Sequence, residues 1–391
     1  MFRYSAQYIL TNRDHPLKRA IVTVEDDGTI LKIEETGGNL REKADVEFHN
    51  GIIIPGFVNC HSHLELSHLK GFISPGKGLG EFIKQIRSLR EADENTTVNS
   101  FLSADQEMFR AGIVLCADIC NTSMTFEIKT KSNIRYINLI ELFGINSSGA
   151  KHRLAEIMKI LNLSRESEIE SWLVPHSAYS LSVKLFRLLK QETLTNRISS
   201  VHFMESESEG KFLQGKRGDI YNSYIESGLL KDQADTVSDH ISAVLKEITL
   251  SGNLILVHNT FVDRPTIREI EKRNRVFWCL CPNSNLYISN SMPPLDLLTA
   301  EDCEIVIGTD SLASNNQLSI LEELKTIQKL YPGTRLEDLV RWATLNGAKA
   351  LGQDLKFGSI EEGKKPGLLL IRNVDLVNLK LLPDSSVTRL I

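Results

Sequence analysis

Two histidines separated by one residue are candidate metal ligands. His61-Ser62-His63 directly follows residues 53–60, an apolar run with the composition of a buried strand. Side chains two residues apart in a strand point to the same side, so both imidazoles can reach one ion at ~2.0–2.1 Å. A His-x-His pair also arises by chance, so the prediction of a metal site needs further residues.

Further side chains of the metal-binding type follow other strand-like runs. His202 ends one run, His258 ends the next, and Asp310 follows a third in the stretch 307–310. If these runs are strands of a barrel, their C-terminal ends meet around one mouth, where enzymes of this fold have their active sites. We therefore expect five metal-type side chains at one mouth.

Glu205 stands three residues after His202, just beyond the predicted strand. At that place it can face the site without binding the ion, which suits a group that transfers protons. The alternative is an exposed loop carboxylate like its neighbours Glu207 and Glu209.

The elements that would position these residues alternate along the middle of the chain. Short apolar and β-branched runs alternate with helical patterns, which is typical of parallel βα units. Eight runs have this character: 53–60, 113–118, 136–142, 172–176, 198–203, 254–258, 276–280 and 304–308. Eight is the strand number of a (β/α)8 TIM barrel, although an open doubly wound sheet would give the same alternation.

The two ends of the chain have a different pattern, with short strand-like pieces separated by glycine-containing turns. We expect a small β-sandwich lobe built from both termini, with residues 1–52 and 353–391 flanking a barrel over 53–352. The polar segment 206–239 is long for a βα loop. It is either a lid over a pocket or an ordinary solvated helix and loop.

Composition excludes several classes of protein. Of the 391 residues 41% are hydrophobic and 24% charged, which is typical of a globular protein with a large core. The net charge is −5 and no basic stripe occurs, so we expect no nucleic-acid partner. Neither a signal-peptide pattern nor an apolar run of ~18 residues occurs, which predicts a cytoplasmic protein without membrane contact. The six cysteines are predicted to be small core residues.

The ordered set of motifs resembles the amidohydrolase superfamily, in the branch of cytosine deaminase, guanine deaminase and the triazine chlorohydrolases. The matching stretches are PGFVNCHSHLELS at 55–67, PHSAYSLS at 175–182, HFMESE at 202–207, LVHN at 256–259, IGTDSLASNN at 307–316, NGAKALG at 346–352 and GSIEEGKKPG at 358–367. One departure is Lys365-Pro366-Gly367, where this branch usually has an Ala-Asp pair; it concerns the β lobe.

The resemblance implies one divalent metal ion, zinc or iron. The implied ligands are His61, His63, His202 and Asp310. No lysine ends the fourth run, so the carbamylated lysine of binuclear relatives is missing, which favours a single ion.

The resemblance also assigns the remaining roles. It implies Glu205 as the general acid and base, His258 as the residue that orients the attacking water, and Asp310 as the acceptor of a second proton. His176 is an implied substrate contact. Glu65 is a second candidate contact, with the alternative that its carboxylate supports the histidines through hydrogen bonds.

The resulting prediction is a hydrolytic deaminase in which a metal-bound hydroxide attacks an aminated heterocycle or a nucleoside-like small molecule. One specific candidate is aminodeoxyfutalosine, because relatives acting on it share a similar HLELS-type motif. The same site also serves chlorohydrolases and cyclic amidohydrolases, and a non-catalytic binding protein of the same fold is a further alternative. Homodimers are common in the family. The zinc deaminases with a Pro-Cys-x-x-Cys motif are excluded, because that motif is absent.

Overall fold

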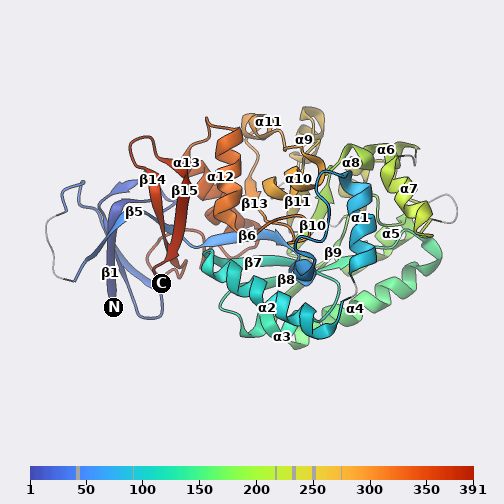
Figure 1. Cartoon of the computed structure of the whole chain (residues 1–391), viewed down its shortest axis with the longest axis horizontal. Coiled ribbons are helices and arrows are strands. Elements are labelled where there is room, and N and C mark those ends of the chain that lie inside the picture. The colour runs from blue at the N-terminus through green and yellow to red at the C-terminus, as the bar shows by residue number, and fades with distance from the viewer. Residues whose placement is uncertain (41–44, 91, 216–217, 231–234, 249–251, 274) are drawn as a thin grey trace.

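The computed structural model describes the chain except for residues 41–44, 91, 216–217, 231–234, 249–251 and 274. Figure 1 shows a β lobe with both termini at one end of the long axis and a larger α/β part at the other. Tyr4 and Leu390 are joined by a hydrogen bond from the tyrosine hydroxyl, 3.3 Å long, so the two ends of the chain pack together.

The buried apolar runs form two four-stranded parallel sheets. The strands of the first are β6 (Phe57–Ser62), β7 (Ile113–Cys120), β8 (Arg135–Leu142) and β9 (Glu170–Pro175). Those of the second are β10 (Ile198–Phe203), β11 (Asn253–His258), β12 (Val276–Leu280) and β13 (Ile305–Ile307). In β6, β7, β10, β12 and β13 every side chain is buried, which explains why these runs are apolar without alternation.

Helices connect the strands and cover the sheets (Figure 1). The longer ones are α1 (Gly78–Leu89), α2 (Glu94–Arg110), α4 (Ala150–Glu166), α5 (Val183–Glu192), α6 (Glu207–Gly215), α7 (Asp219–Glu226), α10 (Pro282–Ser289) and α12 (Ile320–Leu330). The shorter ones are α3 (Phe126–Lys131), α8 (His240–Ser242), α9 (Arg264–Ile270), α11 (Leu295–Ala300), α13 (Leu336–Arg341) and α14 (Gly347–Ala350). Several begin at a side chain that accepts a backbone N–H, as Asp93 does for α2 and Ser182 for α5.

The predicted alternation of parallel strands and helices is confirmed, with one correction at its start. The run 53–60 is not a single strand, because its first residues belong to β5 (Glu47–Pro55) and β6 begins at Phe57. Gly56 joins the two strands, and a Cβ there would lie 2.4 Å from Val114 Cγ1 and 2.6 Å from the Pro366 carbonyl oxygen. Only glycine fits this joint.

The β lobe consists of β1 (Phe2–Ile9), β2 (Leu17–Lys18), β3 (Ile21–Val24), β4 (Ile30–Glu34), β5, β14 (Leu368–Asp375) and β15 (Lys380–Arg389). The expected β-sandwich is wrong, since these strands join in one seven-stranded sheet. The reason is that β5 pairs with β1 on one side and with β14 on the other, which connects the strands of both termini.

The described part of the segment 206–239 forms α6 and α7, while residues 216–217 and 231–234 of that prediction lie outside the described chain. All six cysteines are buried and free, as predicted. Among the helices of the described residues, none combines the length and apolarity needed to cross a lipid bilayer.

A buried ion pair supports the strand that carries the two spaced histidines. Lys129 Nζ lies 2.6 Å from Asp118 Oδ2, and both side chains are fully buried. Asp118 Oδ1 accepts the backbone N–H of Leu64 at 2.8 Å, one residue after His63. Burial acts to lower the pKa of Lys129, but the Asp118 carboxylate prevails and raises it. The lysine therefore stays charged, and the pair fixes the backbone that follows His63.

We expect Lys129→Met to lower the free energy of unfolding by about 3 kcal/mol, because it leaves the Asp118 charge buried without a partner. Urea unfolding followed by circular dichroism measures the loss. The control is Lys131→Met, which removes an exposed lysine paired with Glu127 and should cost under about 0.5 kcal/mol. Equal losses in the two variants would contradict a special role of the buried pair.

Candidate active site

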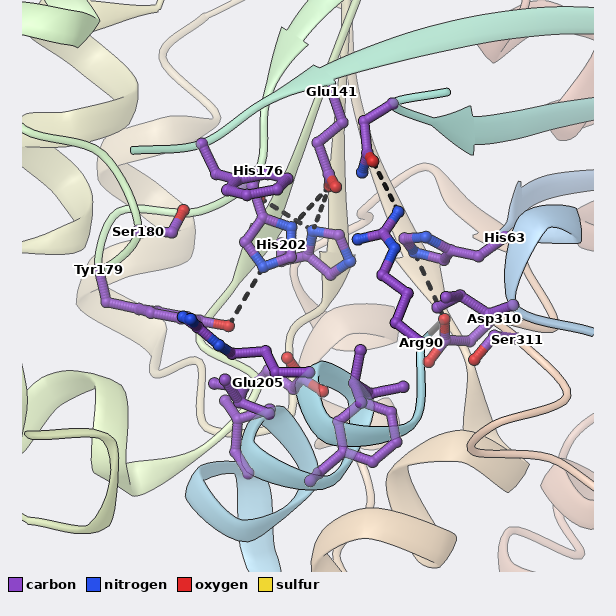
Figure 2. Close-up of a pocket in the computed structure, with 18 of the residues that line it drawn as sticks. His63, Arg90, Glu141, His176, Tyr179, Ser180, His202, Glu205, Asp310 and Ser311 are labelled. Carbon is purple, nitrogen blue, oxygen red and sulfur yellow. Dashed lines mark hydrogen bonds and ion pairs between the residues drawn. The ribbon is translucent and has the colours of Figure 1, made fainter. Parts of the chain in front are cut away.

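Four of the predicted residues meet where strands of the two sheets end. His63 Nε2 lies 3.2 Å from His61 Nε2, and Asp310 Oδ1 lies 3.7 Å from His61 Nε2 and 3.5 Å from His63 Nε2. A nitrogen of His202 completes a group of histidine atoms that all lie within 4.8 Å of one another. In Figure 2, His63 and Asp310 approach His202 across the pocket. The residues come from distant parts of the chain, so only the fold brings them together.

The donor atoms of this cluster fit a metal ion. Two nitrogens bound tetrahedrally to zinc at ~2.0–2.1 Å lie about 3.3 Å apart, close to the separation of the His61 and His63 Nε2 atoms. His202 Nδ1 lies 2.9 Å from the His176 carbonyl oxygen, which can only accept, so Nδ1 carries the proton and Nε2 is free. Burial, with the neighbouring histidines, lowers the pKa of both His61 and His202, which keeps them neutral.

Asp310 is held by two hydroxyl groups and by a close approach of the backbone. Its Oδ2 accepts Ser284 Oγ at 2.6 Å and Ser314 Oγ at 2.7 Å, leaving Oδ1 directed at the histidines. Gly308 lies so close to His61 that a Cβ would be 2.8 Å from the His61 Cβ. Asp310 itself adopts a φ of 57°, a left-handed conformation that turns the chain sharply after β13.

His258 is fixed in one orientation by an amide. Its Nδ1 lies 2.8 Å from Asn285 Oδ1, while Asn285 Nδ2 donates to Thr260 Oγ1 at 2.6 Å. The proton of His258 is thus on Nδ1, and its Nε2 lies 3.7 Å from Glu205 Oε1. The arrangement places an imidazole nitrogen without a proton beside the carboxyl group of Glu205.

Glu205 is buried at the pocket floor, not exposed in a loop, and burial raises its pKa to about 7. A carboxyl group with such a pKa can both accept and donate a proton near neutral pH. Its backbone is fixed by Glu209, whose Oε1 accepts the N–H of Glu205 at 2.7 Å and of Ser206 at 2.9 Å. Glu209 Oε2 in turn lies 2.9 Å from His240 Nε2.

His176 lines the same pocket and is paired with Glu141 from the end of β8. The His176 Nδ1 atom lies 2.6 Å from Glu141 Oε1, and its Nε2 lies 3.5 Å from the Tyr179 hydroxyl (Figure 2). Burial opposes charge on both groups, yet their mutual attraction lowers the pKa of Glu141 to about 2 and raises that of His176. Glu141 thus holds the His176 ring by its Nδ1 atom, and the Nε2 side of the ring remains available to the pocket.

Glu65 lies at the pocket wall, where three neighbours occupy its oxygens. Arg90 Nη2 donates to Oε1, and Oε2 accepts from the Asn121 N–H and the Thr122 hydroxyl, both at 3.1 Å. No described histidine is hydrogen-bonded to Glu65. Its carboxylate therefore fixes Arg90 and the loop after β7.

The cluster opens into a cavity of about 460 Å³, a size typical of small-molecule sites. Its floor is lined by Glu205 and by the metal-type residues His63, His202, His258 and Asp310, with His61 buried behind them. Apolar side chains line the outer wall: Leu66, Leu79, Phe82, Ile83, Ile86, Phe143, Ile145 and Leu229. The cavity thus has a polar reacting end and an apolar outer end.

Sequence reasoning missed several residues of this site, notably Glu141, Arg90, Glu209 and Asn285. A carboxylate inside the mostly apolar run 136–142 was a signal for Glu141. Arg90 lies at the end of a helix, and Glu209 and Asn285 lie within helices, where polar side chains are common and give no signal.

The sequence comparisons identify the family. Residues 52–386 match the family model described as the Amidohydrolase family. The chain belongs to the amidohydrolase family. The predicted family and enzyme class, an amidohydrolase acting on carbon–nitrogen bonds, are therefore confirmed.

Individual relatives of this amidohydrolase extend over nearly its whole length. It is 28% identical to a 5-methylthioadenosine/S-adenosylhomocysteine deaminase of Pyrococcus abyssi, over 97% of this chain and 86% of the relative. Helicobacter pylori aminofutalosine deaminase, solved with methylthio-coformycin, superposes with a TM-score of 0.77 at 22% identity, covering 95% and 92% of the two chains. Atrazine chlorohydrolase of Arthrobacter aurescens TC1, complexed with zinc, superposes with a TM-score of 0.74 at 16% identity, covering 94% of this chain and 86% of the chlorohydrolase.

We expect the metal-free amidohydrolase to bind zinc below pH 6.5, the ordinary pKa of histidine. The pKa values of His61 and His202 are lowered, so these ligands remain neutral as the pH falls through that value. Atomic emission after dialysis against buffered zinc at pH 6 measures the uptake.

His202→Ala should abolish that uptake, whereas His240→Ala, which removes a buried histidine outside the cluster, should preserve it. Loss of zinc from the parent protein already above pH 6.5 would contradict the neutral-histidine site.

Proposed function

We propose that this amidohydrolase is a hydrolytic deaminase of 6-aminopurine nucleosides that requires one divalent ion, most simply zinc. The carrying observation is the position of Glu205, a buried carboxyl group with a pKa of about 7 that lies beside His258 in the cavity that His63 and His202 also line. We assign His61, His63, His202 and Asp310 as the ligands. A cation held there lowers the pKa of a bound water from 15.7 to about 7.

The protein's own residues would transfer the protons of the reaction. Glu205 accepts one proton of the attacking water and delivers it to the ring nitrogen beside the carbon that carries the amino group. Oxygen adds to that carbon, and the second water proton passes through Asp310 to the amino group. The carbon–nitrogen bond then breaks, ammonia leaves, and a carbonyl group remains. Proton transfer of this kind contributes about 10²–10⁴-fold to rate.

The remaining polar residues would hold the reacting ring. His258, fixed by Asn285, directs its unprotonated Nε2 toward the attacking oxygen and accepts a hydrogen bond from the hydroxyl group of the tetrahedral carbon centre, which stabilises that centre. His176, held by Glu141, is placed to contact the heterocycle, and Glu65 to contact the substrate together with Arg90.

The choice of an adenosine-like substrate draws on the relatives. Proteins named as methylthioadenosine/S-adenosylhomocysteine deaminase and 5'-deoxyadenosine deaminase match over 97% and 91% of this chain. The cavity supports it, because an aminopurine at the polar floor would leave its substituent against the apolar outer wall. Chlorohydrolysis is the second candidate, since the atrazine enzyme has a similar fold.

We further propose that the two parallel sheets close into one eight-stranded barrel over residues 53–352, flanked by the lobe of 1–52 and 353–391. Contacts at both seams support the closure. The His202 N–H donates to the His176 carbonyl oxygen at 2.9 Å, and the Asp310 N–H donates to the His61 carbonyl oxygen at 3.0 Å. Parallel bridges pair Ser177 with His202 and Ser62 with Asp310.

We expect Glu205→Gln to keep its zinc but to lose about 10²–10⁴-fold in kcat, because glutamine cannot accept the water proton. Ammonia release from adenosine, 5'-deoxyadenosine and 5-methylthioadenosine, with metal content on the same sample, measures both quantities. Glu207→Gln, an exposed neighbour, is the control. A near-normal kcat in Glu205→Gln would refute its role. Zinc without ammonia in the parent protein would shift the search to chlorinated substrates.

A further inference from the structure

A buried glutamate of helix α12 has no part in the proton transfers described above. Glu323 has no exposed surface, and its carboxyl group lies between α10 and the loop that follows β13. Burial raises the pKa of this carboxyl group to about 8, although hydrogen bonds from Asn283 and Asn315 act to lower it. Because burial is unfavourable for a carboxyl group, an apolar residue would be more stable here unless the two oxygens are needed.

On one side, Glu323 holds the first turn of α10. Asn283 is the second residue of that helix, where a backbone N–H has no partner within the helix. Glu323 Oε2 accepts this N–H at 2.8 Å. The next residue is Ser284, whose Oγ donates to Asp310 Oδ2 at 2.6 Å. The position of this hydroxyl group therefore depends on a helix end that Glu323 fixes.

On the other side, Glu323 holds the loop that carries Asp310 itself. Asn315 Nδ2 donates to Glu323 Oε1 at 2.8 Å and to the Thr309 carbonyl oxygen at 2.9 Å. Ser314, the residue before Asn315, donates to Asp310 Oδ2 at 2.7 Å. Within the described chain no hydrogen bond or ion pair joins Glu323 to Asp310 directly, so Glu323 can act on Asp310 only through these neighbours.

We propose that Glu323 is a positioning residue that sets both serine hydroxyl groups on Asp310 Oδ2 and thereby directs Asp310 Oδ1 at the metal-binding histidines. This inference rests on the ligand set of the proposed function. Asp310 adopts a left-handed φ of 57°, a conformation that a residue with a side chain keeps only when its surroundings hold it. Contacts that orient a metal ligand from behind typically contribute about 10–100-fold to metal affinity.

The zinc affinity of Glu323→Gln tests the proposal without relying on turnover. Glutamine keeps the shape of the side chain and one accepting oxygen, but its amide nitrogen cannot accept the second N–H. We expect the dissociation constant for zinc, from competition with a chelator at pH 7, to rise about 10-fold. The matched control is Glu322→Gln, which changes a partly exposed carboxylate of the same helix that pairs with Lys325. It should keep the parent value.

Cobalt(II) bound in place of zinc shows whether the geometry of the site changes. Its visible absorption depends on the coordination geometry, which a loss of stability elsewhere in a folded protein would leave alone. We expect the spectrum to change in Glu323→Gln and to stay the same in Glu322→Gln. If Glu323→Gln does not fold, Asn315→Ala breaks one half of the same network and gives the same comparison. A parent-like zinc affinity and cobalt spectrum in the folded variant would overturn the proposal.

A double-mutant cycle shows whether the effect passes through the serines. In the protein with Ser284→Ala and Ser314→Ala, Asp310 Oδ2 has already lost both hydroxyl donors. Adding Glu323→Gln to this protein should therefore weaken zinc binding by about 3-fold at most, because coupled residues do not act additively. A further loss as large as in the parent protein would overturn the proposal.

Asp310→Ala separates this proposal from the proposed function. Parent-like zinc binding by Asp310→Ala would refute the ligand assignment and the role of Glu323 with it. Loss of zinc in Asp310→Ala, with parent-like binding in Glu323→Gln, would refute the role of Glu323 and support the ligand assignment. The expected zinc affinities and cobalt spectra, with no ammonia released by the parent protein, would support the role of Glu323 and refute the deaminase.

Discussion

The proposed metal site depends on one constraint: the imidazoles of His61, His63 and His202 must direct ring nitrogens at a single point. Nothing local can do this, because His61 and His202 lie in different sheets and 141 positions apart in the sequence. Burial disfavours the charged forms of His61 and His202, and the backbone carbonyl of residue 176 accepts a hydrogen bond from Nδ1 of His202, which leaves Nε2 of that ring free. Two further contacts hold the cluster together. The Ser284 and Ser314 hydroxyl groups fix the Asp310 carboxylate, and the lack of a side chain at Gly308 lets the backbone approach His61 closely.

Much of this arrangement could be predicted from the sequence. Buried parallel strands are recognisable as apolar runs, and the polar residues of the site follow directly at the ends of these runs. His61, His202, His258 and Asp310 each end or follow such a run, and the structure brings the four side chains together in one cluster. What failed was the pairing of strands far apart in the chain. β5 pairs with β14, more than 300 positions away, and no local pattern encodes that partner, so a sandwich was expected where one sheet exists.

The supporting residues were missed for a related reason. Glu209 and Asn285 act through what they contact, the Glu205 backbone and the His258 ring, and not through a motif of their own. Arg87 lies in the last turn of α1 and Arg90 directly after that helix; both have the same chemistry, yet only Arg90 is paired with Glu65. The sequence cannot distinguish two such residues, since the difference lies in a carboxylate brought by another element.

The joint at Gly56 connects the site to a strand from the far end of the sequence. β5 passes through this residue directly into β6, whose end bears His61, and β5 is itself held by β14 at residues 368–371. A ribosome must therefore translate residues 368–371, more than 300 positions after His61, before the strand that leads to His61 gains this partner. Proteolysis in the C-terminal lobe would remove that support, so a cut far from His61 in the sequence would reach the site through β5.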